Sequence, residues 1–233
     1  MTATTAKSGF VQGMIDGAPF LLVGVPFATL FGVVSEAAGL DTAQTVVMSA
    51  LVIAGASQFT AVQLRSENAP VWLALLSAIT VNLRVAMYSA ALQPHLGPAR
   101  LSHRVLAAYL NTDSAFALGL QRFEAEPAMP LSTRIAYFCG TMFPMGPLWV
   151  VFTWVGAVFG ARLFAGLPLD FAMPILFLAL SAPMLRSLAH VAAAITSIVA
   201  ALALVWLPSG LGIVFAAMAA MAVGAEVERR RTP

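Results

Sequence analysis

Two short polar stretches interrupt apolar segments of this chain. The letters "AGASQF" include Gly55, Ser57 and Gln58, and the letters "NLR" begin at Asn82 and end at Arg84. A glutamine offers two donors and an acceptor, and an arginine carries a permanent positive charge. An isolated charge at the centre of a bilayer costs on the order of 3 kcal/mol, so these groups need partners or a water-filled cavity. Such residues in apolar surroundings indicate a site that binds a polar solute.

The composition indicates that the surrounding segments lie in a membrane. Hydrophobic residues make up 60% of the 233 residues and charged residues only 9%, whereas soluble domains carry about 25% charged residues. At about 20 residues for each crossing, the chain has room for about eight spans and for no soluble catalytic domain. Backbone groups must be paired in hydrocarbon, so the spans must be helices. The predicted fold is an all-α polytopic transmembrane helix bundle, one domain over residues 1–233.

We predict eight spans, with seven as the alternative because the fourth could be re-entrant. Their expected residues are 17–36, 43–64, 70–93, 102–121, 134–163, 171–188, 190–207 and 209–226. The fifth contains Pro144 and Pro147 and is expected to break there, because proline removes a backbone donor. The distribution of Lys and Arg over this topology predicts a cytoplasmic N-terminus and C-terminus.

An internal repeat is also expected, with halves at 10–125 and 130–226. The segments that begin at Gly13 and Gly140 share a proline, a Phe-Gly pair and an Ala-Gly-Leu triplet. Secondary transporters often combine such repeats with broken helices and bind substrate near the midplane between the halves. The sequence leaves open whether the repeat is parallel or inverted.

Arg84 and Asp113 are the two charged residues that lie deep in expected spans. Each lies about a dozen residues from the loop "PHLGPAR", which places both roughly 15–20 Å from the turn in an antiparallel helix pair. They are therefore expected to meet, and Tyr88 shares the helix face of Arg84 at i+4. One interpretation is a purely structural ion pair. The other is that the pair lines a path for a zwitterion, or that Asp113 carries a proton.

The neighbouring polar residues divide between packing and binding. Asn82 is expected to hydrogen-bond a neighbouring helix. Gly55 and Ser57 could serve helix packing alone, but the amide of Gln58 needs partners in hydrocarbon. We expect Gly55 to Gln58 to lie at a local unwinding or a tight crossing that holds an amino-acid head group.

Several classes of function find no support in the sequence. There is no phosphate-binding loop, no metal-ligand spacing and no G-x-S-x-G elbow. The chain has one cysteine, three histidines and a net charge of +2, which do not suggest a zinc site or a nucleic-acid partner. We therefore expect no enzyme activity, no catalytic residue, no metal and no cofactor.

The runs "SALVIAGASQFTAV", "VNLRVAMYSAAL" and "LNTDSAFAL" resemble the AzlC family, the large permease subunit of bacterial branched-chain amino-acid exporters. The likeness extends over nearly the whole chain. It implies a multi-pass protein of the cytoplasmic membrane that exports branched-chain or similar neutral amino acids, driven by protons, together with a small AzlD-like subunit. Two positions depart from the family pattern: Val85 replaces a frequent histidine and Ser114 replaces a frequent acidic residue.

The leading hypothesis is an exporter of a neutral aliphatic amino acid. Substrate-binding residues would be Gly55, Ser57, Gln58, Asn82, Arg84 and Tyr88, and Asp113 would pair with Arg84 or carry a proton. The alternative is a non-transporting scaffold subunit whose polar residues in the lipid bilayer only dock a partner.

Overall fold

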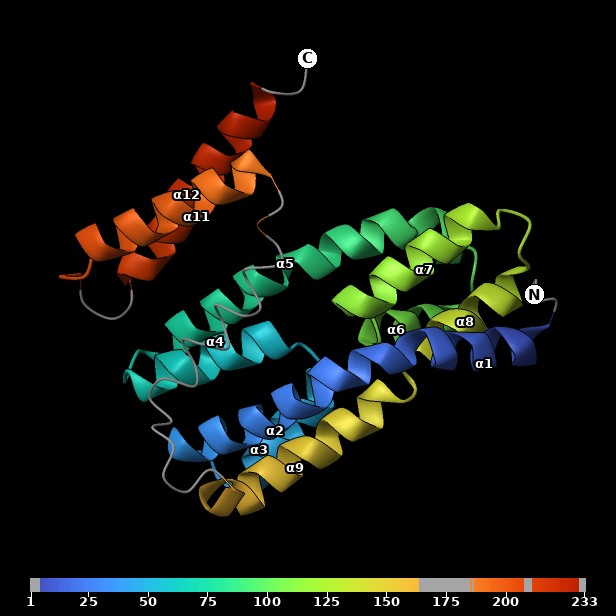
Figure 1. The fold of residues 1–233 in the computed structure, drawn as a ribbon, viewed down its shortest axis with the longest axis horizontal. Coiled ribbons are helices and arrows are strands. Elements are labelled where there is room, and N and C mark those ends of the chain that lie inside the picture. Colours follow the sequence, from blue (N-terminus) through green and yellow to red (C-terminus); the bar gives the residue numbers. More distant parts are fainter. Residues whose placement is uncertain (1–4, 164–184, 186, 208–210, 231–233) are drawn as a thin grey trace. The chain divides into compact units, whose positions relative to one another are not determined.

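The computed structural model describes residues 5–163, 185, 187–207 and 211–230, and these residues form helices and no strand (Figure 1). They divide into two compact units: residues 1–62 with 78–163, and residues 63–77 with 164–233. The all-α fold class is confirmed. The expected span at 171–188 lies almost wholly outside the described residues.

Three helical segments among the described residues are long and apolar enough to cross a bilayer: Ala6–Ala37, Val71–Leu96 and Leu131–Gly160. The first consists of α1 (Ala6–Gly17), the short 3-10 helix η1 (Ala18–Phe20) and α2 (Leu21–Ala37). The second is α5 (Val71–Leu96). The third consists of α8 (Leu131–Met142) and α9 (Met145–Leu163).

The first segment starts earlier than expected, whereas the third segment is interrupted where the sequence predicted a break. The first helix begins eleven residues before the expected start at residue 17, because Thr5 and Ser8 form a capping box that starts α1 at Ala6. The interruption between α8 and α9 falls at Phe143 and Pro144, as predicted. Both segments are therefore broken helices.

The first and third segments pack side by side and run in the same direction. A side chain at Gly13 would overlap the carbonyl oxygen of Tyr137, and one at Gly32 would overlap that of Thr153. Contacts therefore advance together along both segments, α1 against α8 and α2 against α9, as Figure 1 shows. Glycines at these contacts let the two backbones approach closely, as in many membrane helix pairs.

The expected span at 43–64 is wrong as a single crossing. It forms α3 (Thr42–Leu51) and α4 (Gly55–Ser66), separated by residues 52–54, with an extended backbone at Val52. The Ser49 Oγ lies 3.3 Å from the Gln58 Nε2, although nine residues of straight helix span about 13 Å. The chain therefore turns back at residues 52–54, and α3 and α4 form a helical hairpin.

The expected span at 102–121 also forms a hairpin, in line with the re-entrant alternative. It consists of α6 (Leu101–Tyr109) and α7 (Asp113–Ala125), separated by residues 110–112. The hydroxyl of Thr112 accepts a hydrogen bond from the Ala115 amide, so a polar N-cap starts a new helix where a straight span was expected. Gly119 of α7 packs against the ring of Phe138 in α8.

The second unit contains α11 (Leu188–Ala203) and α12 (Leu211–Arg229), close to the expected spans at 190–207 and 209–226. The two helices pack together. Gly224 of α12 lies against the side chain of Ala193 in α11. At the end of α12, Glu226 forms ion pairs with Arg229 and Arg230.

Candidate functional site

The middle of α5 joins the tips of the two hairpins. The Asn82 Nδ2 donates to the Ser57 Oγ in the first turn of α4 at 3.0 Å. Two residues further along α5, the Arg84 Nη2 lies 3.2 Å from the Asp113 Oδ2 at the start of α7. Asn82 and Arg84 lie on different faces of α5, so one helix contacts both hairpins. The expected meeting of Arg84 with Asp113 takes place.

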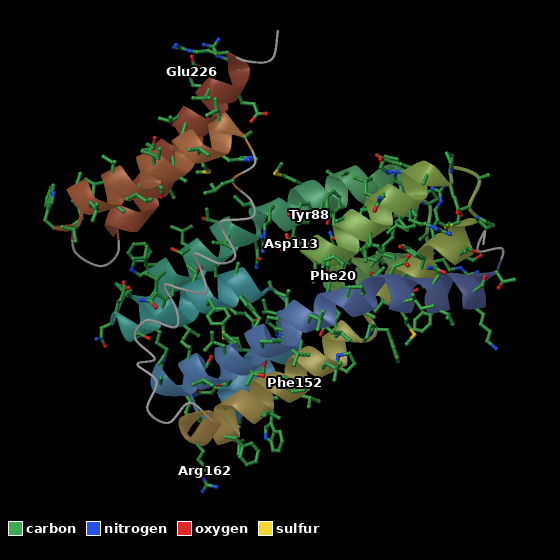
Figure 2. The ribbon with its side chains drawn as sticks, viewed as in Figure 1. Phe20, Tyr88, Asp113, Phe152, Arg162 and Glu226 are labelled. Carbon is green, nitrogen blue, oxygen red and sulfur yellow. The ribbon has the colours of Figure 1, made fainter. Side chains whose placement is uncertain are left out.

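Tyr88 completes the contact with α7. Its hydroxyl donates to the Asp113 Oδ1 at 2.7 Å, and its ring stacks on Phe116 with centroids 4.2 Å apart and planes 10° apart. Figure 2 shows Tyr88 and Asp113 next to one another. The Arg84 side chain is 30% exposed and that of Asp113 57% exposed. A charged pair this open does not suit contact with lipid, because hydrocarbon penalises charge, so it must face water or another protein surface.

The two hairpin tips present helix N-termini of different electrostatic character. Asp113 lies in the first turn of α7 and places a carboxylate at the positive end of that helix dipole. The first turn of α4 contains no acidic residue. The first intrahelical bond of α4 runs from the Gln58 amide to the Ala54 carbonyl, so the amides of Gly55, Ala56 and Ser57 point out of the helix end. This end of α4 is suited to bind an anion.

Gln58 points away from α5 into a buried polar cluster. Its Nε2 donates to the Ser49 Oγ, and Ser49 shares a hydrogen bond of 3.0 Å with Thr153 of α9. All three side chains are fully buried. The Gln58 Oε1 has no hydrogen-bond partner among the described residues. Ser49 and Thr153 were not predicted from the sequence, because single hydroxyls are common in apolar helices and carry no signal.

Gly55 is required where the tip of the first hairpin meets the core. A side chain there would overlap the ring of Phe27 and lie 2.9 Å from the ring of Trp149. The indole Nε1 of Trp149 is buried and has no partner in the described part of the chain. The tip is thus packed closely between α2 and α9. The expected unwinding lies three residues earlier, at 52–54, and Gly55 to Gln58 form the first turn of α4.

The two tips also touch one another. The hydroxyl of Tyr109, at the end of α6, donates to the carbonyl oxygen of Ala50, near the end of α3. At the second tip, the Asn111 Nδ2 donates to the Ser89 Oγ of α5 at 3.2 Å. Neither Tyr109 nor Asn111 was predicted as a site residue, although Asn111 stands two positions before Asp113 in the quoted "LNTD".

A cavity lies beside the Arg84–Asp113 pair. Ser89 and Asn111 line it, but none of the site residues predicted from the sequence does. In the described part of the chain, no group of three or more His, Cys, Asp or Glu residues is placed to hold a metal ion. The geometry offers ion pairing, hydrogen bonding and a helix end, which can bind a polar solute.

The model of the AzlC protein family matches residues 19–163, which include both hairpins and α5. The chain belongs to the AzlC family. It is 26% identical over 175 residues to the inner membrane protein YgaZ of Escherichia coli, covering 72% of this chain and 70% of that protein. It is 29% identical over 228 residues to an uncharacterized membrane protein of Archaeoglobus fulgidus, covering 94% and 95%. No solved structure matches the chain. The AzlC chain described here is thus a membrane protein of a transport family.

Proposed function

We propose that this AzlC-family chain is the permease subunit of a secondary transporter that exports branched-chain or similar neutral amino acids across the cytoplasmic membrane. The observation that carries the proposal is the meeting of the two hairpin tips at the middle of α5, where Asn82 contacts Ser57 of the first tip and Arg84 contacts Asp113 of the second. Discontinuous helices whose ends meet near the midplane are typical of transporter binding sites.

The start of α4 is the proposed site for the substrate's carboxylate. Its amides point out of the helix end, and no acidic residue of the first turn competes for them. The Asn82 Oδ1 is buried and lacks a partner among the described residues, and it accepts a hydrogen bond from the substrate's ammonium group. Ser57 orients Asn82 through the hydrogen bond between them. Gly55 contributes one of these amides and lets the tip pack against the rings of Phe27 and Trp149, and Gln58 fixes the tip from behind.

Asp113 is the proposed proton carrier. It forms an ion pair with Arg84 of α5, and protonation would neutralise its carboxylate and release Arg84. The resemblance to the family implies titratable groups at two positions that here hold Val85 and Ser114, so we assign proton transfer to Asp113 in the first turn of α7. The released guanidinium of Arg84 can then bind another partner, and the α6–α7 tip is no longer held by the ion pair. Proton uptake is in this way coupled to movement of that tip. Tyr88 holds the carboxylate in place through its hydroxyl.

A small AzlD-like membrane subunit is the proposed partner. The middle of α5 exposes the side chains of Ile79, Leu83 and Met87 next to the open charged pair. An apolar helix of a second subunit can cover this stripe, and the lipid bilayer surrounds the rest.

Export can be tested with purified protein in liposomes, with and without the small subunit. Arg84→Ala should abolish efflux of radiolabelled leucine while the protein still inserts and assembles. Arg162→Ala is the matched control, because Arg162 is an exposed arginine at the far end of α9. Unchanged export by Arg84→Ala would refute the assignment of the site.

Co-purification of the small subunit with the same variants separates transport from a scaffolding role, which the exposed pair of Arg84 on α5 and Asp113 on α7 would also suit. A scaffold predicts that Arg84→Ala loses the small subunit in co-purification, and that the wild-type complex moves no amino acid in liposomes. A transporter predicts efflux from the complex and loss of efflux with the complex still assembled.

A further inference from the structure

The cavity between α5 and α6 has a volume of about 300 Å³ and belongs entirely to the first unit. Its walls are mainly aliphatic. They are formed by Leu92, Leu96, Leu101 and Val105, with small residues at Gly97, Ala107 and Ala108 and the amide of Gln93 among them. A space of this size with these walls suits one branched aliphatic side chain and its head group.

Polar groups lie at both ends of this cavity. Arg104 stands near the start of α6, is exposed, and makes no ion pair among the described residues. Asn111 stands at the other end, is 6% exposed, and its Oδ1 has no hydrogen-bond partner in the described structure. A buried acceptor without a partner costs about 1–3 kcal/mol. A ligand in the cavity could therefore donate a hydrogen bond to Asn111 and place an anionic group beside Arg104.

One end of the cavity, lined by Leu96, Gly97 and Leu101, lies at the end of the unit where basic residues collect. The Arg134 Nη1 lies 3.2 Å from the His95 Nδ1, so the start of α8 meets the end of α5, and α1 starts beside α8. The Lys and Arg residues at this end are Lys7, Arg100, Arg104, Arg122 and Arg134. Within the unit, Arg162 lies at the opposite end. Excess positive charge marks the cytoplasmic side of a membrane protein.

We propose that this cavity is the cytoplasmic entry site of the exporter, where an amino acid with a branched aliphatic side chain binds before it reaches the hairpin tips. Arg104 pairs with its carboxylate, Asn111 accepts a hydrogen bond from its ammonium group, and Leu92, Leu96 and Val105 hold its side chain. The inference rests on the proposed function, because it supplies an entrance to the site between the tips. Asn111 and Asp113 lie on the same tip, two residues apart, so the inner end of the cavity adjoins that site.

The separation of the two polar groups suits a single zwitterion. Arg104 and Tyr109, the last residue of α6, lie five residues apart, roughly 8 Å along the helix axis, and Asn111 follows two residues later. An amino-acid head group with a hydrogen bond at each side bridges most of that gap, and the long arginine side chain spans the remainder. A lipid would leave Asn111 unsatisfied, because its acyl chain carries no donor. The chemistry therefore favours an amino acid over a lipid.

The test uses the full-length protein in inverted membrane vesicles, with Cys139 changed to serine. Ala108→Cys places a thiol on the cavity wall, and Leu106→Cys places one on the same helix outside the lining. A membrane-impermeant maleimide modifies each thiol with and without L-leucine. We expect leucine to slow modification at Ala108→Cys by about fivefold or more and to leave Leu106→Cys unchanged. Glycine and L-lysine should protect neither.

A second variant tests the assigned carboxylate contact. Added to Ala108→Cys, Arg104→Ala should raise the leucine concentration needed for protection by about tenfold or more, because a charge-assisted hydrogen bond is lost. Arg100→Ala, which removes a basic residue outside the lining, should not. Equal protection in the Arg104→Ala and Arg100→Ala variants would overturn the assignment of Arg104.

Leucine efflux measured in the same vesicles keeps the two proposals apart. Efflux without protection at Ala108→Cys would overturn the entry site and leave the proposed function standing. Protection without efflux would support the entry site and count against the proposed function. If phosphatidylglycerol slows the modification and leucine does not, the cavity is a lipid site and the inference is wrong.

Discussion

The two hairpins have similar lengths but are held in place by different physics. The tip of the first is buried between α2 and α9, and neutral hydrogen bonds join Gln58, Ser49 and Thr153 behind it. The tip of the second is open, and it is attached to α5 through the charged Asp113, whose side chain is 57% exposed. A cavity lies beside the second tip.

This difference indicates which tip can move when a carboxylate is protonated. Closely packed buried groups do not rearrange without a large cost, so the α3–α4 tip serves as a fixed wall. The α6–α7 tip is held by an ion pair and a tyrosine hydroxyl, and both contacts depend on the protonation state of one carboxylate. We therefore expect changes to the buried contacts behind the first tip to alter mainly stability, and changes to the contacts of the second tip to alter mainly export.

The largest effect is expected from Asp113→Asn. The amide keeps the size of the side chain but cannot exchange a proton and gives Arg84 no opposite charge; because the pair is largely exposed, its loss costs about 1 kcal/mol or less in stability. Leucine export in liposomes should fall by about a hundredfold or more because the group that transfers the proton is lost, while thermal unfolding changes little. Glu126→Gln is the matched control, because Glu126 pairs with Arg122 at 2.9 Å at the other end of α7. Equal losses in both variants would contradict a special role for the tip.

Gly55→Ala should destabilise the protein by about 1–3 kcal/mol. The added methyl group would overlap the Phe27 ring in the closely packed first tip. The midpoint of thermal unfolding in detergent measures this effect, with Gly146→Ala as the control, since a methyl there meets only the Ile53 side chain at 3.9 Å within the described surroundings. Equal midpoints of thermal unfolding for Gly55→Ala and Gly146→Ala would contradict the close packing of the first tip.

Ser49→Ala and Thr153→Ala should each lower the free energy of unfolding by about 1–2 kcal/mol. Either change removes the hydrogen bond of 3.0 Å between α3 and α9. Ser49→Ala also removes the acceptor of the Gln58 amide, whereas Thr153→Ala leaves Ser49 paired with Gln58 alone. The double variant should cost less than the sum of the single variants, because the two residues share one interaction. Strict additivity would show that the bond contributes nothing.

Tyr88→Phe should have the smallest effect. It removes the hydroxyl that donates to Asp113 but keeps the ring stacked on Phe116. Loss of one hydrogen bond of about 1 kcal/mol predicts a roughly fivefold fall in export, with unfolding unchanged. A loss as large as that of Asp113→Asn would mean that the hydroxyl itself takes part in proton transfer.

Much of the helical architecture could be predicted from the sequence. The break near Pro144 followed from proline chemistry, and the meeting of Arg84 with Asp113 followed from their equal distances from the loop. The folding back of the α3–α4 segment could not be predicted, because its length and hydropathy match those of a straight span. A turn at Val52 to Ala54, which has no proline and one glycine after it, leaves no local signal.

The partners of buried hydroxyls could not be predicted either. Ser49 and Thr153 are more than one hundred residues apart in sequence, and only tertiary packing brings them together. Asn111 could have been found, since it is a buried amide beside an acidic residue. The folding back of the α3–α4 segment also changes the distribution of positive charge, because it reverses the direction of α5 and brings Arg100 and Arg104 to the same end as Lys7.

The glycine contacts between α1–α2 and α8–α9 have a mechanical consequence. Gly156 lies against the carbonyl oxygen of Thr29, so one main chain rests on the other with no side chain between them that could adopt another rotamer. We expect the α1–α2 and α8–α9 segments to keep a fixed position relative to each other while other parts of the transporter move. Spin labels attached across these two segments should report one distance in every state of the cycle, whereas labels on the α6–α7 tip should not.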